Sequence, residues 1–250
     1  MPRVCCFSEP STSWFRRAPR LRVSETRIFA RSVGDGRQAL AYDLRLDTSH
    51  PVALILPLPT SSAAEDALRF VDLSRDTGLF DALAALFEPP MQWLSGDFSA
   101  SRSAPLAVHD VGSFVASFVP TARDFSRLDR RFRAPRALFD ARPEYADHGF
   151  AVFQLKPGHT KVHPMAFTFP TRAPSRLFFP TVHVHHGSLP ATAEFDHALY
   201  YQANGEAPGD ERAPDRPTQH HEGLVLVGAP VARRSIRGVR PNADTWIELG

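Results

Sequence analysis

Histidines are the residues of this chain best suited to chemistry. There are 11 in 250 residues, and His183, His185 and His186 stand almost together. Side chains two residues apart on a strand point to the same face, so His183 and His185 would project side by side. Two parallel imidazoles can bind one transition metal ion. We therefore predict a metal site on this strand.

A zinc or copper ion needs one or two further ligands there. Donors of the right type are close in the sequence: His163, His197, Glu194 and Asp196. A metal-activated water at such a site would permit hydrolysis, although the sequence identifies no catalytic residue. The simpler alternative is a sheet-edge strand whose imidazoles bond to backbone or water. No glycine-rich loop precedes a helix, so no nucleotide cofactor is expected.

Two adjacent cysteines, Cys5 and Cys6, offer a second kind of chemistry. Thiolates suit Cu(I) or Zn(II), and an activated cysteine could serve a hydrolase or another thiol-active protein. Adjacent cysteines cannot form the spaced disulfide framework of a small secreted domain. The favoured state is a pair of buried, reduced thiols, which is typical of a cytoplasmic location.

Composition and charge limit the classes of partner. The chain is 43% hydrophobic and 22% charged, with 29 basic against 27 acidic residues, so a net charge of +2 does not predict nucleic-acid binding. No apolar run approaches the roughly 20 residues of a membrane span, and the N-terminus has no signal-peptide pattern. Four arginines near the C-terminus (Arg233, Arg234, Arg237 and Arg240) are interpreted as a solvated tail.

A non-enzymatic interaction module is the competing hypothesis. Residues 1–22 are polar and rich in arginine, with Trp14 and Phe15 as bulky anchors. Aromatic side chains on a polar arm are typical of a surface for a protein partner or for a homo-oligomer.

The elements that must position these residues are short. Alternating residues on both sides of Gly34-Asp35-Gly36 predict a hairpin, and residues 52–56 predict a buried strand. Further strands are expected at 111–119, 149–155, 163–169, 177–185, 195–202, 224–227 and 246–249. Helical patterns cover residues 78–87, 124–129 and 135–145.

These elements predict an α+β fold. It would contain an antiparallel or mixed β-sheet, about three short helices and extended N- and C-terminal arms. The expected organisation is an arm at 1–22, a single α+β domain at 23–202, a flexible segment at 203–222 and a C-terminal strand or arm at 223–250.

Several architectural motifs carry a family resemblance over residues 28 to about 181. They are Leu56-Pro57-Leu58-Pro59, Leu79-Phe80-Asp81, Gly149-Phe150-Ala151-Val152 and Phe167-Thr168-Phe169-Pro170. With them the chain resembles an uncharacterised family of bacterial proteins of unknown function, marked by Leu-Pro-x-Pro and Thr-Phe-Pro strand exits. The resemblance implies an architecture and no activity.

Overall fold

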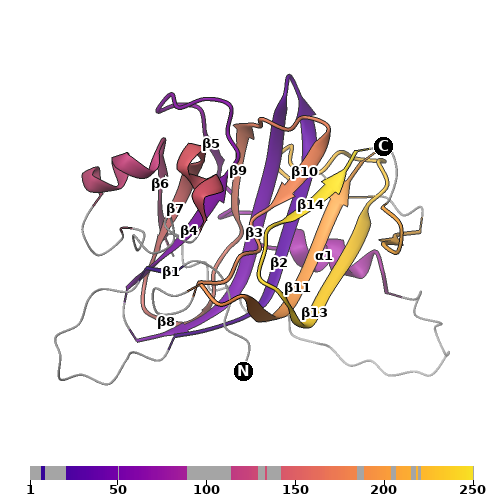
Figure 1. Cartoon of the computed structure of the whole chain (residues 1–250). Coiled ribbons are helices and arrows are strands. Elements are labelled where there is room, and N and C mark those ends of the chain that lie inside the picture. The colour runs from indigo at the N-terminus through magenta and orange to yellow at the C-terminus, as the bar shows by residue number, and fades with distance from the viewer. Residues whose placement is uncertain are drawn as a thin grey trace.

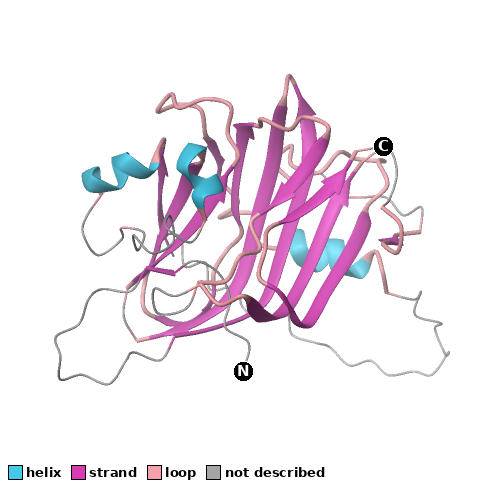
Figure 2. Cartoon of the chain, viewed as in Figure 1, coloured by secondary structure: helices cyan, strands magenta, loops and turns pink. Residues whose placement is uncertain are grey.

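The computed structural model describes residues 7–8, 21–49, 51–88, 114–128, 133, 142–184, 189–203, 207–214, 218 and 221–249. Strands dominate this part of the chain (Figures 1 and 2). The described helical elements are α1 (Leu79–Ala85) and two 3-10 turns, η1 (Ala122–Arg127) and η3 (Pro143–Asp147). The α+β prediction with three short helices is therefore wrong. Turns of five or six residues cannot bury an apolar helical stripe, so sheet packing determines the fold.

The larger sheet has the strand order β12-β13-β11-β2-β3-β9-β5, with β8 paired to one end of β3. Its strands are β2 (Leu21–Gly34), β3 (Arg37–Thr48), β5 (Arg69–Val71), β8 (Gly158–Lys161), β9 (Met165–Pro170), β11 (Thr192–Gln202), β12 (Glu211–Arg212) and β13 (Ala232–Pro241). All pairings are antiparallel except that of β11 with β2.

The predicted glycine hairpin is confirmed by the pairing of β2 with β3. Its turn needs left-handed backbone at three successive residues, Gly34, Asp35 and Gly36. Glycine and aspartate tolerate that conformation better than most residues.

The smaller sheet has the order β1-β4-β7-β6 and is antiparallel throughout. Its strands are β1 (Phe7–Ser8), β4 (Val52–Leu58), β6 (Phe114–Val119) and β7 (Gly149–Leu155). Every residue of β4 is buried, as predicted. Leu54 and Leu56 face the core between the sheets, whereas Ala53 and Ile55 face a second cluster outside it.

Among the described residues, three apolar clusters hold these layers together. The main core lies between the inner faces of the sheets and includes a short pair of strands, β10 (Arg176–Phe179) and β14 (Thr245–Glu248). The α1 helix covers the other face of the larger sheet, where Phe80 and Leu83 join Phe29 and Tyr200. The expected helix at 78–87 is thus confirmed in its central seven residues.

Three local expectations differ from the structure. The strand expected at 177–185 ends at Phe179, and residues 180–184 continue without ladder pairing. Residues 224–227 form bends and the start of a turn instead of a strand, and the arginines expected in a solvated tail belong to β13. In the described part of the chain, no helix combines the length and apolar character that a membrane span requires.

Candidate functional site

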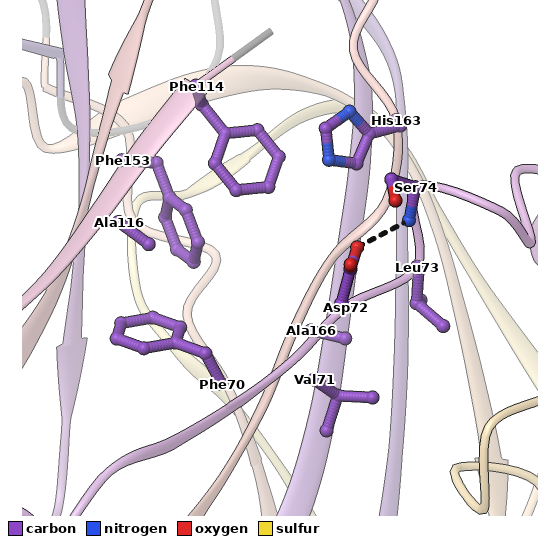
Figure 3. Close-up of a pocket in the computed structure, with 10 residues that line it drawn as sticks. All are labelled: Phe70, Val71, Asp72, Leu73, Ser74, Phe114, Ala116, Phe153, His163 and Ala166. Carbon is purple, nitrogen blue, oxygen red and sulfur yellow. Dashed lines mark hydrogen bonds between the residues drawn. The ribbon is translucent and has the colours of Figure 1, made fainter. Parts of the chain in front are cut away.

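A pocket of about 340 Å³ opens where the two sheets approach each other. The end strand of the larger sheet, β5, contributes Phe70 and Val71 to its lining, and the end strand of the smaller sheet, β6, contributes Phe114 and Ala116. The remaining lining residues are Asp72, Leu73, Ser74, Phe153, His163 and Ala166 (Figure 3). Residues far apart in the sequence therefore meet here because two sheet edges face each other.

One wall of the pocket is aromatic. Phe153 of β7 lies at its centre, with Phe114 edge-on at a ring-centroid distance of 5.3 Å and Phe70 edge-on at 5.8 Å. Phe153 is fully buried, whereas Phe70 is 41% exposed and presents part of its ring to solvent. Such edge-to-face contacts fix the rings in place, so this wall is preformed.

The opposite wall carries the polar groups of the pocket. Asp72, Ser74 and His163 lie along it in Figure 3, beside Val71, Leu73 and Ala166. The backbone N–H of Ser74 donates a hydrogen bond of 2.8 Å to Asp72 Oδ1. The backbone and hydroxyl of Ser74 lower the pKa of Asp72 below its usual value, so this exposed carboxylate is ionised at neutral pH.

His163 closes the pocket where the two walls meet. Its ring stacks on Phe114 at a centroid distance of 4.4 Å. Partial burial lowers the pKa of His163 despite the opposing attraction of Asp72, so the imidazole is mainly neutral at pH 7. Among the described residues that line the pocket, only Asp72 carries a formal charge at that pH, and Arg75 acts on it from outside the lining.

A serine, a histidine and an aspartate thus share one pocket, but in an arrangement unlike that of an acyl-transfer site. In such a site the carboxylate orients the imidazole and the imidazole activates the hydroxyl. Here the carboxylate of Asp72 accepts its hydrogen bond from Ser74. The arrangement suits recognition of a ligand better than nucleophilic attack.

The histidines predicted as metal ligands fall into separate regions. His183 and His197 come together as nearly parallel buried rings, with a centroid distance of 5.1 Å. His163 instead stacks on Phe114 in the pocket, and His185 lies outside the described residues. His183 follows β10 as irregular backbone, so the strand geometry expected for it is wrong.

Burial dominates the chemistry of the pair formed by His183 and His197. Phe195 packs against both rings, with ring-centroid distances of 4.2 Å to His183 and 5.2 Å to His197. Burial lowers the pKa of His197 to about 3, with a smaller contribution from His183. In the described part of the chain, no group of three or more histidine, cysteine, aspartate or glutamate side chains could hold a metal ion. A zinc or copper site that includes His185 stays a prediction.

Side chains from the loop between β13 and β14 hold the backbone around His183. Asn242 accepts a hydrogen bond of 2.7 Å from the backbone N–H of His183 and donates one of 2.7 Å to its carbonyl. Asp244 accepts bonds from the backbone N–H groups of Thr181 and Val182 and from the hydroxyl of Tyr145. Burial raises the pKa of Asp244 to about 6. Two polar side chains therefore replace the missing strand ladder.

Sequence reasoning selected His163 but missed Asp72, Ser74 and the three phenylalanines around it. Strands are expected at 111–119 and 149–155, but nothing in their sequence shows that β5 approaches from the other sheet. The Asp-x-Ser spacing, which allows a carboxylate to accept a bond from the backbone two residues later, was the available local signal. Cys5, Cys6, Trp14 and Phe15 lie outside the described residues.

Comparison with known proteins gives no family for this chain. No family model matches it, and no curated protein matches it. The predicted resemblance to an uncharacterised bacterial family therefore stays a prediction.

Solved structures of baculovirus P35 match over most of the chain. The crystal structure of P35 is 13% identical, with 92% of this chain and 97% of that chain covered and a TM-score of 0.49. A mutated P35 after caspase cleavage is 13% identical, with 90% of this chain and 99% of that chain covered and a TM-score of 0.48. The caspase-8/P35 complex is 11% identical, with 90% of this chain and 96% of that chain covered and a TM-score of 0.42. At these values, function has to be argued from the residues of this chain.

Proposed function

We propose that this chain is a non-enzymatic binding protein whose pocket receives an ammonium group carried on an apolar stem. One observation carries the proposal: an ionised carboxylate, Asp72, faces an aromatic wall across a preformed cavity. A cation gains from the carboxylate and from the negative faces of aromatic rings. The apolar stem gains by covering Phe70 and Phe114, whose rings are partly exposed.

The neutral state of His163 strengthens this choice of ligand charge. A protonated imidazole would compete with a bound ammonium group for Asp72, but burial opposes that protonation at neutral pH. The pocket thus presents one negative charge, and an anionic ligand would be repelled.

The ammonium group can belong to a lysine side chain of a partner protein or to a free amine, and we favour the lysine. In the described part of the chain, β5 pairs only with β9, and β6 pairs only with β7. The pocket is therefore flanked by two unpaired strand edges, which can hydrogen-bond the backbone of an extended segment. A free amine would leave those edges unused.

Calorimetric titration with small probes tests the pocket chemistry. We expect n-pentylammonium to bind with a dissociation constant on the order of 1 mM, and n-pentanol to bind at least about tenfold more weakly. Asp72→Asn keeps the shape of the side chain and should weaken pentylammonium binding about tenfold. Asp35→Asn, in the β2–β3 turn, is the matched control and should leave binding unchanged. Equal binding of the alcohol and the amine would contradict the proposal.

Titration with a lysine-containing peptide distinguishes the two sources of the amine. An acetylated and amidated Thr-Val-Lys-Val-Thr peptide should bind at least about tenfold more tightly than pentylammonium, because its backbone can pair with the strand edges. Replacing its lysine with acetyl-lysine removes the charge and should weaken peptide binding at least about tenfold, because the contact with Asp72 is lost. A peptide that binds no better than pentylammonium would favour a free amine as the ligand.

A further inference from the structure

The outer edge of β13 is open over most of its length. On one side β13 pairs with β11 along its whole length, from Ala232 opposite Tyr201 to Pro241 opposite Thr192. On the other side β12 covers only Ala232 and Arg233. In the described part of the chain no strand follows beside residues 234–241, and Figure 1 shows β13 at the margin of the sheet.

Two hydrogen bonds show which backbone groups of β13 point outward. The carbonyl of Val231, just before the strand, accepts a bond of 2.9 Å from Ala213 on the β12 side. The carbonyl of Arg237 accepts a bond of 3.2 Å from Nε of Arg240, a side-chain donor. In an antiparallel strand the outward groups alternate, so Ser235 and Val239 share this direction with Arg237. These three residues offer a short hydrogen-bonding edge, which ends at Pro241 because proline has no N–H.

The arginines of β13 differ in whether their charge is already balanced. Arg233 forms an ion pair of 2.6 Å with Glu211, and Arg234 forms one of 2.7 Å with Asp210. Arg237 and Arg240 are exposed, and within the described residues neither lies within ion-pair distance of a carboxylate. The open part of the strand therefore carries the two arginines that form no close ion pair within the described residues.

Arg237 has one acidic neighbour across the strand pair. Asp196 lies opposite it in the β11–β13 register and their charges attract, but the Asp196 carboxylate is bonded at 2.9 Å to the backbone N–H of Glu25 and forms no close ion pair with Arg237. Next along the same face, Val239 is 69% exposed, the most exposed of the large apolar residues in the described part of the chain. The edge thus presents a cation and, two residues further, an apolar side chain.

We propose that an extended acidic segment of a partner protein adds to β13 as a further strand. An acidic residue of the segment lies opposite Arg237, and an apolar residue two positions along lies opposite Val239, on the same face of the sheet. Backbone bonds to Ser235, to Val239 and to the N–H of Arg237 supply affinity, because the carbonyl of Arg237 already accepts a bond from Arg240. The two side-chain contacts supply selectivity. A second copy of β13 would bring arginines together, which disfavours pairing of this edge with itself.

Fluorescence anisotropy with a labelled peptide tests this proposal on the full chain. The peptide Thr-Val-Thr-Glu-Thr-Val-Thr-Glu should bind, and its counterpart with lysine in place of glutamate should bind at least about tenfold more weakly. The double variant R237E/R240E should weaken binding of the glutamate peptide about tenfold and improve binding of the lysine peptide. R22E/R123E changes the net charge equally at exposed arginines on other strands and turns, and should have little effect.

A second measurement isolates the backbone contribution. Methylating alternate peptide nitrogens on the edge that faces β13 should abolish binding, and Ser235→Pro should do the same while Ser235→Ala does not. An unchanged melting temperature for R237E/R240E serves as the folding check. Equal binding of both peptides, or insensitivity to R237E/R240E and to methylation, would overturn the proposal and leave β13 as a charged, protected edge. Asp72→Asn should not alter peptide binding at β13, so a negative result for the β13 edge leaves the proposal for the pocket untouched.

Discussion

Histidine, aspartate and phenylalanine meet at two places in this molecule, and the two differ in access to solvent. In the pocket, half-buried His163 and exposed Asp72 face an aromatic wall across open space. Around His183 and His197, the same residue types are buried, with no opening among the described residues. The side chains of Asn242 and Asp244 there accept hydrogen bonds from backbone N–H groups. Residue type alone therefore does not make a binding site. In the pocket, which is the open region, a ligand can replace the solvent. In the closed region around His183 and His197, the same types of side chain stabilise the fold instead.

The largest expected effect is a stability loss in the closed region. Asn242→Ala removes the partners of the N–H and carbonyl of His183 and of the carbonyl of Pro190. Leaving buried backbone groups without partners should lower the free energy of unfolding by about 3 kcal/mol. Urea denaturation followed by circular dichroism measures it. A loss below about 1 kcal/mol would mean that the closed region is not held by this side chain.

Acid should destabilise the closed region next. Two buried histidines carry this effect: His197, and His148, whose ring lies beside Tyr145. Burial lowers the pKa of His197 to about 3 and that of His148 to about 4, against 6.5 for free histidine, so the stability they provide is lost as pH falls below 6.5. Asp244 acts in the opposite sense, because its folded pKa of about 6 lies above 3.8 and protonation relieves a buried charge. With two losses against one gain, we expect a net loss of about 2 kcal/mol between pH 7 and pH 5.

His197→Phe sharpens that prediction. Phenylalanine keeps a ring beside Phe195 and His183 but cannot be protonated, so this variant should retain at pH 5 about 2 kcal/mol that the parent chain loses. Thermal melts at both pH values provide the comparison. If the variant and the parent lost stability equally, His197 would not be an acid-sensitive group.

The open region should respond in binding rather than in stability. Phe70→Leu shortens a ring that is already 41% exposed, so the melting temperature should change little. Loss of an aromatic face for the cation should weaken pentylammonium binding about fivefold. Calorimetry and a thermal melt on the same sample check both halves. A large fall in the melting temperature would show that Phe70 belongs to the structural core.

The smallest effect is expected at Ser74. Ser74→Ala removes the hydroxyl but keeps the backbone N–H that bonds Asp72, so the carboxylate stays ionised at pH 7. Pentylammonium affinity should therefore change by less than about twofold. A complete loss of binding would instead assign the hydroxyl a direct contact with the ligand.

The sequence predicted the elements whose signals are local. The β2–β3 hairpin follows from alternating residues around a glycine turn, β4 from a fully apolar run, and α1 from helical spacing before two prolines. The α+β class failed because the helix predicted at 124–129 is a six-residue 3-10 helix at 122–127. The helix predicted at 135–145 lies mostly outside the described residues, which show only a five-residue 3-10 helix at 143–147. Local capping signals do not reveal that a segment is too short to pack as a helix.

The candidate sites depended on contacts that no local pattern contains. The sequence by itself determined alternation, turn positions and the choice of His163 and His183 as notable residues. Only the tertiary structure decided that His163 joins Asp72 and three phenylalanines, that His183 pairs with His197, and that the C-terminal arginines line an open strand edge. The physical reason is that side-chain periodicity is fixed by backbone geometry over a few residues. The pairing of distant strands is instead fixed by burial of the whole apolar surface.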